Sequence, residues 1–438
     1  MNWNDWRHRI DERTLTIGIV GLGYVGLPLA CEFARAGFIV WGVDLRADRV
    51  AQILDGTCPI EGDEPGLAEL LHHVVTTGRL HASTNYADLA DADVITLNVD
   101  TPVGVDHLPR YDALRSACAA LGPVLKRDAL VIVESTVSPG TTEGLVRMTL
   151  ETSSGLRCGI DFALGACPER VMPGRLLANL RGVSRVCGGA SPETAHAMTH
   201  LYRTIVPHAD LDATDIITAE LVKTVENAYR DVNIAFANET ALLCEQVGGN
   251  VWAVRDLVNK SPGRTMLLPG AGVGGHCIPK DPWLLIAGHA SSAKLIPAAR
   301  AVNDAMPVHI AALALRTANR DQPRILLLGY TYLENSDDVR ASPTERTAAA
   351  LRASGADVRI HDPHVPEYAG HTISETAVEC DVVVLMVRHA AYESIDWGSL
   401  AAVVAQPPRI VDGRGFLDKA KLRALGWRCV ELGVGGEP

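Results

Sequence analysis

Short runs of apolar residues alternate along this chain with segments in which apolar residues recur every three or four positions. The first runs are TIGIV at 16–20, FIVWGV at 38–43, VITL at 94–97 and LVIV at 130–133. Such runs are typical of parallel strands buried on both faces, and the periodic segments between them are typical of amphipathic helices. The first part of the chain is therefore predicted to form an α/β domain.

The same alternation returns near residue 323, in PRILLLGYTY, ADVRIHDP, CDVVVLMV and RIVDGRG. Between the two halves, residues 212–250 carry apolar positions at helical spacing and end in Gly248-Gly249. This spacing predicts one long helix. We expect two Rossmann-like doubly wound domains joined by this helix, which also supplies a dimer surface.

A glycine-rich turn follows the first apolar run, and it reads Gly21-x-Gly23-x-x-Gly26. After a strand and before a helix, this spacing is typical of a dinucleotide site, with the pyrophosphate against the backbone and the helix N-terminus. Asp44 closes the next strand, where a carboxylate accepts from ribose hydroxyls and repels a 2′-phosphate. The pattern therefore predicts NAD rather than NADP.

Three polar residues follow later strands of the same half, at the edge that faces the ligand in such folds: Thr101, Ser135 and Thr136. For Thr136, a place near a helix cap is as good an interpretation as a place near the cofactor. Arg49 either flanks the adenosine or is a solvated surface arginine. The second half lacks the glycine pattern, so we expect it to bind a mononucleotide or to complete a dimer.

Composition narrows the class of protein. The 438 residues suffice for two or three domains, and the net charge of −12 argues against nucleic-acid or anionic-membrane partners. Ten cysteines include no C-x-x-C pair, which predicts neither a disulfide framework nor a zinc site. The polar start lacks a signal core, and no apolar run reaches the roughly 20 residues of a membrane span. We expect a cytoplasmic protein without a metal site.

One cysteine lies in an unusual segment, LLPGAGVGGHCIPKDPWLL at 267–285. Cys277 is either a small buried hydrophobe or a nucleophile that a ligand reaches across the glycines. A thiol at a helix N-terminus has a lowered pKa, and Asp281 would share its face. On the long helix, Lys223 and Asn227 are four residues apart and share a face, either as a solvated stripe or as a group that stabilises negative charge on oxygen.

These residues belong to a series of motifs that resembles the nucleotide-sugar 6-dehydrogenase family. The motifs are GIVGLGYVGLPLA, NVDTPVG, ESTVSPGTT, CPERVMPG, ELVKTVENAYRDVNIAFANE, GVGGHCIPKDP, SDDVRASP and VDGRG, in this order over nearly the whole chain. The resemblance implies four-electron oxidation of a sugar C6 alcohol to the acid, with two NAD consumed. It also implies a homodimer built on the long helix.

The resemblance assigns roles to individual residues. Cys277 is implied to form the thioester, Lys223 and Asn227 to hold the oxyanion with Asp281 beside them, and Glu169 and Thr136 to order water. The implied cofactor-binding residues are Gly21, Gly23, Tyr24, Val25, Gly26, Asp44, Arg49, Thr101, Ser135, Thr136 and Arg340. The implied substrate-binding residues are Glu169, Arg170, Val171, Lys223, Asn227, Arg264, Gly272, Gly274, Gly275, His276 and Arg414. The corresponding regions are a cofactor domain at 1–208, a central region at 209–312 and a nucleotide-sugar domain at 313–438.

The motifs also bear on the substrate. GVGGHC and CPERVMPG resemble the UDP-N-acetylhexosamine branch, although UDP-glucose and GDP-mannose stay open as alternatives. The family usually reads AFKPDTDDxRxSP where this chain has TYLENSDDVRASP, so Leu333 replaces an expected lysine that contacts the sugar-nucleotide. Loss of such a charged contact costs on the order of 1.5–3 kcal/mol, which raises the hypothesis of a variant substrate.

Two other classes of function fit the same cleft-forming architecture. An ordinary two-electron dehydrogenase would stop at the aldehyde or ketone and would need no cysteine. A sugar-nucleotide-binding protein without turnover would not need Cys277, Lys223, Asn227 and Asp281 together.

Overall fold

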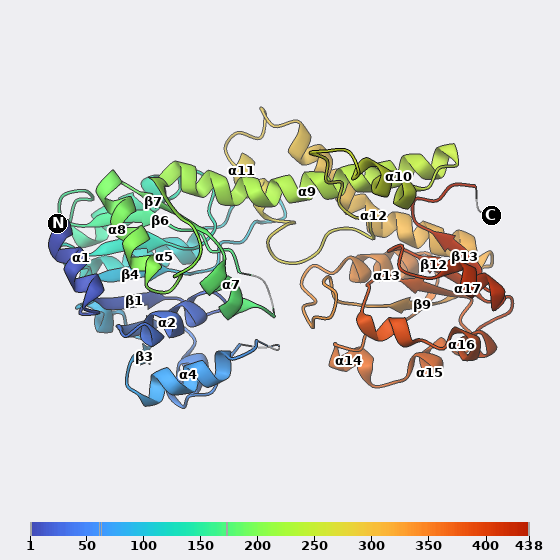
Figure 1. The fold of residues 1–438 in the computed structure, drawn as a ribbon, viewed down its shortest axis with the longest axis horizontal. Coiled ribbons are helices and arrows are strands. Elements are labelled where there is room, and N and C mark those ends of the chain that lie inside the picture. Colours follow the sequence, from blue (N-terminus) through green and yellow to red (C-terminus); the bar gives the residue numbers. More distant parts are fainter. Residues whose placement is uncertain (1, 61, 63, 172–173, 437–438) are drawn as a thin grey trace. The chain divides into compact units, whose positions relative to one another are not determined.

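A computed structural model describes residues 2–60, 62, 64–171 and 174–436. The chain separates into two compact units, one made of Met1–Glu226 with Trp283–Gly288 and the other of Asn227–Pro282 with His289–Pro438 (Figure 1). The helix α9 (Ile216–Val247) crosses the boundary between them. The three-region division at 208 and 312 stays a prediction.

The first unit is built on an eight-stranded sheet with the strand order β3-β2-β1-β4-β5-β6-β7-β8. Its strands are β1 (Thr16–Val20), β2 (Ile39–Val43), β3 (Leu80–Ser83), β4 (Val94–Leu97), β5 (Leu130–Val133), β6 (Ala163–Ala166), β7 (Arg185–Gly189) and β8 (Leu211–Asp215). Neighbouring strands are parallel except for β6 and β7, which are antiparallel. The apolar runs alone did not distinguish this reversal.

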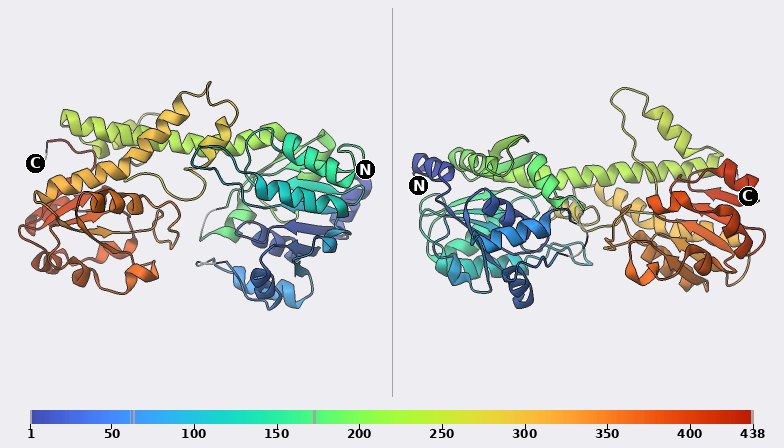
Figure 2. Two further views of the ribbon diagram at one scale, coloured as in Figure 1. Left: turned by 180° about the vertical axis from the view of Figure 1, so that it is seen from behind. Right: turned by 60° about the horizontal axis from the view of Figure 1, so that its bottom comes forward.

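Alternate residues of the strands enter two separate cores, one on each face of this sheet. Leu130 and Ile132 belong to one buried cluster, whereas Val131 and Val133 belong to the other. This pattern requires helices on both faces, and Figure 2 shows them there. The helices are α1 (Trp3–Asp11), α2 (Gly26–Arg35), α3 (Ala47–Leu54), α4 (Leu67–Thr76), α5 (Asp112–Leu121), α6 (Arg147–Ser154), α7 (Leu176–Gly182) and α8 (Pro192–Arg203), with short helical turns at Tyr86–Leu89, Gly122–Val124 and Thr142–Val146.

The second unit contains a five-stranded parallel sheet in the order β10-β9-β11-β12-β13. The strands are β9 (Arg324–Leu328), β10 (Asp357–His361), β11 (Val382–Leu385), β12 (Arg409–Asp412) and β13 (Arg428–Glu431). Residues of β9 and β11 again alternate between two buried clusters. The helices that follow α9 are α10 (Val251–Val258), α11 (Asp281–Ile286), α12 (Leu295–Ala318), α13 (Pro343–Ala353), α14 (Pro366–Ala369), α15 (Ile373–Ala377), α16 (Trp397–Val403) and α17 (Lys419–Ala424), with a turn at Ala390–Ser394. The prediction of two doubly wound α/β halves is confirmed.

The long helix is shorter than the predicted range of 212–250. Residues Leu211–Asp215 form the edge strand β8, which pairs with β7. The Asp215 carboxylate accepts a hydrogen bond from the Thr218 backbone N–H at 2.8 Å, so it caps a helix that begins at Ile216. Gly248 follows the last helical residue with a φ of +78°.

Among the described residues, no helix combines the length and the apolar character that crossing a membrane requires.

Candidate active site

The glycine turn after β1 fits a bound dinucleotide. A Cβ atom on Gly21 would lie 2.8 Å from the carbonyl oxygen of Asn98, and one on Gly26 would lie 1.9 Å from the carbonyl oxygen of Gly21. These two positions therefore admit only glycine. A Cβ on Gly23 would meet nothing closer than the Arg49 guanidinium at 3.9 Å, so the backbone there is open to a pyrophosphate.

Asp44 ties the glycine turn to the end of β2. Its Oδ2 accepts hydrogen bonds from the backbone N–H of Leu22 and from Arg49 Nη1, both at 2.9 Å, and its Oδ1 accepts from the backbone N–H of Arg46 at 2.9 Å. The carboxylate is buried, and its predicted contact with the ribose hydroxyls stays a prediction. Arg49 is thus an ion-pair partner of Asp44 rather than a solvated surface arginine.

Two more residues of the turn have structural contacts. The Tyr24 hydroxyl donates to the carboxylate of Glu64, which also accepts from the Gly174 backbone N–H at 2.7 Å. Glu64 therefore joins the turn to the segment before α7. Val25 is the residue immediately before α2, and it is half-buried.

The polar residues after β4 and β5 are linked to one another. Thr101 Oγ1 donates to the carbonyl of Thr136 at 2.7 Å, and Ser135 Oγ donates to the carbonyl of Val99 at 2.6 Å. The next helical turn begins at Thr142, after Thr141, so Thr136 lies outside the cap. Thr136 is therefore not a helix cap, and its place near the cofactor stays a prediction.

Glu169 lies in a buried ionic cluster that the sequence did not indicate. Its Oε2 accepts from Arg185, and its Oε1 accepts from the Arg170 backbone N–H at 2.7 Å. Arg185, only 3% exposed, also approaches Glu134 at 3.4 Å, and the Tyr202 hydroxyl donates to Glu134. Burial is the largest cause that raises the pKa of Glu134. The Arg185 guanidinium is thus the shared cation of two carboxyl groups, Glu134 and Glu169.

The neighbours of Glu169 are held from other elements. The Arg170 guanidinium donates to the Ser184 carbonyl at 2.8 Å and pairs with Glu226 of α9 at 2.6 Å. Val171 is half-buried against the first unit's core. The motif CPERVMPG continues into residues 172 and 173, which lie outside the described residues.

Lys223 and Asn227 lie one turn apart on α9, and both are half-buried. Asn227 Nδ2 donates to Asp281 Oδ2 at 2.6 Å, and the other oxygen of Asp281 lies 3.5 Å from Lys280 Nζ. Asp281 is fully buried. The structure thus brings Asn227 and Asp281 together, whereas Lys223 belongs to the other unit and its expected approach to Cys277 stays a prediction.

Cys277 is exposed, with its Sγ 3.9 Å from Nδ1 of His276. Helix α11 begins only at Asp281, and residues 278–280 form a turn in which the backbone N–H of Asp281 donates to the Cys277 carbonyl at 2.8 Å. The thiol therefore precedes the regular helix by one turn, rather than standing at its first residue. The reading of Cys277 as a buried hydrophobe is wrong.

The glycine segment before Cys277 is anchored by buried amides. The Gly270 backbone N–H donates to Asn238 Oδ1 at 2.8 Å, and Asn238 in turn donates to Asn303 Oδ1 at 2.9 Å. A Cβ on Gly274 would lie 2.5 Å from Cβ of Tyr332, so the segment packs backbone to side chain against the loop after β9. Gly272 has a φ of +124°, which favours glycine.

The three remaining predicted arginines, Arg340, Arg414 and Arg264, have different surroundings. The Arg340 carbonyl accepts from the Gly275 N–H at 2.8 Å, and its guanidinium forms a bidentate pair with Asp338. Arg414 follows β12 and lies against Gly270, where a Cβ would be 2.5 Å from its Nη1. Arg264 is exposed and donates to the nearby Pro262 carbonyl at 2.8 Å.

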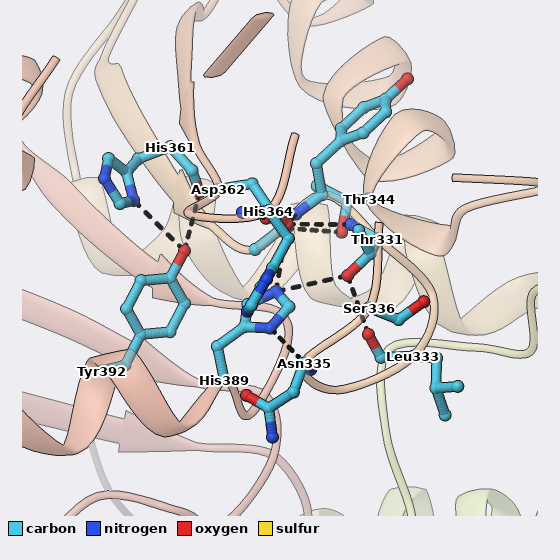
Figure 3. A network of polar contacts seen from close by, with 12 residues as sticks. Thr331, Leu333, Asn335, Ser336, Thr344, His361, Asp362, His364, His389 and Tyr392 are labelled. Atoms are coloured by element: carbon cyan, nitrogen blue, oxygen red, sulfur yellow. Dashed lines mark hydrogen bonds and ion pairs between the residues drawn. The ribbon is translucent and has the colours of Figure 1, made fainter. Parts of the chain in front are cut away.

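The loop after β9, residues 330–342, is held by a buried network that sequence reasoning missed. Figure 3 shows Asp362 and His389 at its centre, with Thr331 and Asn335 around them. Asp362 Oδ2 accepts from the backbone N–H of Tyr330 at 2.6 Å and of Thr331 at 3.1 Å, and it lies 3.1 Å from His389 Nε2. His389 Nδ1 accepts from the Asn335 backbone N–H at 3.0 Å, so Nε2 carries the ring proton.

This network fixes the place of Leu333, whose side chain is exposed. The Leu333 carbonyl accepts from Thr331 Oγ1 at 2.9 Å, and Asn335 Oδ1 accepts from the Ala390 N–H at 2.8 Å. Burial raises the pKa of Asp362, but hydrogen bonds from His389 and the backbone outweigh burial and lower it to about 2. The loop is therefore braced by an ionised, buried carboxylate.

Comparisons with known proteins agree with this geometry. Models of the UDP-glucose/GDP-mannose dehydrogenase family match residues 15–206 with its NAD binding domain, 217–305 with its central domain and 326–419 with its UDP binding domain. The UDP-N-acetyl-D-mannosamine dehydrogenase of Pyrococcus horikoshii is 39% identical over 409 residues, or 92% of this chain and 96% of that protein. The NDP-N-acetyl-D-galactosaminuronic acid dehydrogenase of Ralstonia solanacearum is 36% identical over 430 residues, or 95% and 99%.

A solved structure also resembles the whole chain. The UDP-D-ManNAc dehydrogenase of Pyrococcus horikoshii superposes with a TM-score of 0.89 at 37% identity, and the match covers 96% of this chain and 99% of that one. The predicted resemblance and the predicted cofactor are both confirmed. The chain belongs to the UDP-glucose/GDP-mannose dehydrogenase family, and it is an NAD-dependent nucleotide-sugar dehydrogenase.

Proposed function

We propose that this enzyme oxidises the C6 hydroxymethyl group of a UDP-N-acetylhexosamine to the carboxylate, a four-electron change, with Cys277 as its nucleophile. The observation that carries the proposal is an exposed thiol at the end of a glycine segment, one turn before a buried carboxylate held by Asn227. The names of the relatives in Pyrococcus and Ralstonia support an N-acetylhexosamine.

The chemistry assigned to the chain begins once the alcohol has become an aldehyde. The Cys277 thiolate adds to the aldehyde carbon to form a thiohemiacetal, whose oxidation gives a thioester that water cleaves to the acid and the free thiol. NAD, when bound, supplies the hydride acceptor, and two are consumed per alcohol. Lys223 and Asn227 stabilise the oxyanion at C6, and Asp281 orients the Asn227 amide through its 2.6 Å hydrogen bond.

Water for the last step is assigned to the first unit. Glu169 and Thr136 order it. Arg185 donates to one oxygen of Glu169, and the backbone N–H of Arg170 donates to the other. The remaining binding roles go to Arg170, Val171, Arg264, Gly272, Gly274, Gly275, His276 and Arg414 for the sugar-nucleotide and to Arg340 for the nicotinamide-side phosphates. Guanidinium groups suit phosphates because each can bond two oxygens.

The assembly proposed is a homodimer formed along α9. Seven exposed apolar residues recur on this helix at spacings of four and seven, which places them on one face: Ile217, Leu221, Val225, Tyr229, Phe236, Leu243 and Val247. A second copy would cover this face. A cytoplasmic location and a role in polysaccharide or specialised-metabolite synthesis belong to the same proposal.

The first test is the number of NADH formed per nucleotide-sugar consumed. The panel contains UDP-N-acetylmannosamine, UDP-N-acetylglucosamine, UDP-N-acetylgalactosamine, UDP-glucose and GDP-mannose, and we expect two NADH with one N-acetylhexosamine. Cys277→Ser should lose at least about 100-fold in acid formation, whereas Cys158→Ser, at a half-buried thiol of the first unit, should not.

Three results would contradict parts of the proposal. A single NADH per sugar would indicate a two-electron dehydrogenase, and none with any sugar would indicate binding without turnover. The same panel on Leu333→Lys tests the hypothesis of a variant substrate, since indifference of the activity on ordinary UDP-sugars would count against it.

A further inference from the structure

The second unit gathers three loops at the carboxyl edge of its parallel sheet. Glu334 follows β9, Arg388 follows β11 and Arg414 follows β12. From β9 the chain goes to β10 on one side and later to β11 on the other, so the strand order changes direction between β9 and β11. In open α/β sheets, ligands bind outside the carboxyl ends of the strands at such a switch point.

Two guanidinium groups converge there on one carboxylate oxygen. Glu334 Oε1 lies 3.3 Å from Arg414 Nη2 and 3.8 Å from Arg388 Nε. The side chains are 40%, 23% and 31% exposed for Glu334, Arg414 and Arg388, so the group is open to solvent on one side. Gly270 lies directly against Arg414, which leaves the backbone of the glycine segment beside the cluster.

The two guanidinium groups share the Glu334 carboxylate, and the buried Asp412 carboxylate also acts on Arg414. The Nε atoms of Arg388 and Arg414 are buried and make no hydrogen bond within the described residues. Burial lowers the pKa of Arg414, and the nearby Arg388 lowers it further, although Glu334 opposes this change. A phosphate in place of the Glu334 carboxylate would offset the repulsion between the two guanidinium groups and offer oxygens that accept hydrogen bonds from both.

The surroundings of Arg388 and Glu334 fix the positions of both residues. The Arg388 guanidinium stacks over the Phe416 ring at 5.3 Å, and the next residue, His389, binds the Asn335 N–H. Asn335 directly follows Glu334, so the β9 and β11 loops are fastened together on either side of the switch point (Figure 3). Arg388 thus has a fixed place opposite the loop that carries Leu333.

We propose that Arg388 binds the diphosphate of the nucleotide-sugar together with Arg414. Arg388 thereby supplies a cation in place of the expected lysine, which is Leu333 in this chain. In the unliganded protein the Glu334 carboxylate occupies the place of a phosphate, and the ligand displaces it. The inference rests on the proposed nucleotide-sugar function. It adds a specificity-determining residue, because two guanidinium groups match the two phosphates of a diphosphate better than the single phosphate of a monophosphate.

The test is calorimetric binding of UDP and UMP to the full-length enzyme and its variants. Arg388→Gln should weaken UDP binding by about 10-fold to 100-fold and UMP binding much less, and should raise KM for the sugar-nucleotide with kcat little changed. The double variant Arg388→Gln with Leu333→Lys should recover most of the UDP affinity. Glu334→Gln should tighten UDP binding by about 3-fold to 10-fold, because it removes the competing anion.

The control is Arg409→Gln, which removes the same charge from the opposite end of β12 and should leave UDP binding unchanged. Arg388→Lys is the second variant in case Arg388→Gln misfolds, and it should give an intermediate loss. Unchanged UDP affinity in Arg388→Gln, or weaker binding in Glu334→Gln, would overturn the inference while wild-type turnover stands. If the wild type bound no UDP and oxidised no sugar, the proposed function itself would fail.

Discussion

The first unit builds its cofactor edge from backbone, whereas the second unit builds its ligand edge from buried side chains. Around Gly21 and Gly26 the chain approaches itself so closely that a Cβ would meet a carbonyl oxygen at 2.8 Å or less. Around Glu334 and Arg388 the corresponding loops are held together by hydrogen bonds of the Asp362–His389 pair. Both edges lie at the carboxyl ends of parallel strands, so the same topology supports two kinds of construction.

The difference affects what each edge can tolerate. The glycine turn depends chiefly on the lack of a side chain at Gly21 and Gly26, and Asp44 binds it through the Leu22 backbone N–H. A loop braced by an ionised carboxylate and a neutral histidine depends on protonation and on partners from several elements. Substitutions and pH should therefore separate the two edges.

The largest effect is expected at the buried ionic cluster of Arg185, Glu134 and Glu169 in the first unit. Arg185→Met leaves Glu134 and Glu169 buried without their cation, so the free energy of unfolding should fall by about 3–5 kcal/mol. Denaturant unfolding measures this loss. Arg185→Lys should recover part of the stability and of kcat, because it restores a charge near Glu169.

An exposed ion pair of the same unit is the matched control. Arg147 and Glu151 are one turn apart on α6, and Arg147 Nε lies 3.3 Å from Glu151 Oε1. Arg147→Met should lower the free energy of unfolding by less than about 0.5 kcal/mol. A loss in Arg185→Met no larger than this would show that the buried cluster contributes little to the first unit.

Gly26→Ala tests the backbone construction directly. Its Cβ would lie 1.9 Å from the Gly21 carbonyl oxygen, so the turn must move, and we expect a loss of about 3 kcal/mol in stability with NAD affinity reduced at least about 100-fold. Equilibrium NAD binding and thermal unfolding measure the two effects. Gly144→Ala, where no atom lies within 4 Å of the added Cβ, should change neither. Retained NAD affinity in Gly26→Ala would contradict the assignment of this turn as the dinucleotide site.

The contrast also explains which features were predictable from the sequence. Gly21, Gly26 and Asp44 act within one strand-turn-helix-strand unit, so their spacing along the chain already encodes the geometry. The same holds for the apolar runs of β9 and β11, which occupy alternate cores. Local constraints of this kind can be read without knowing the neighbours.

The missed features depend on residues that are distant in the chain. Arg185 is the first residue of strand β7, and its partners Glu134 and Glu169 follow the ends of other strands. His389 meets Asn335 from 54 positions away, and nothing in MVRHAAYES marks the ring as buried. A buried charged residue in a strand was the one available signal. The start of α9 was misplaced because the polar strand β8 has no apolar run to distinguish it from a helix.

The smallest effect is expected at the brace of the second unit, and it should appear as a dependence on pH. The folded-state pKa of Asp362 is about 2, below its ordinary value of 3.8, so the ionised carboxylate stabilises the fold above that ordinary value. This contribution, about 2 kcal/mol, is present in full above about pH 4 and is lost as the pH falls toward about 2. Hydrogen exchange of the β9 and β11 amides between pH 5 and pH 2.5 measures it. Asp362→Asn should flatten the dependence, whereas Asp337→Asn, at an exposed position of the same loop, should keep the wild-type slope. The same pH dependence in Asp362→Asn as in the wild type would mean that another carboxylate supports the loop. The two edges would then not differ in the way that the charge of Asp362 predicts.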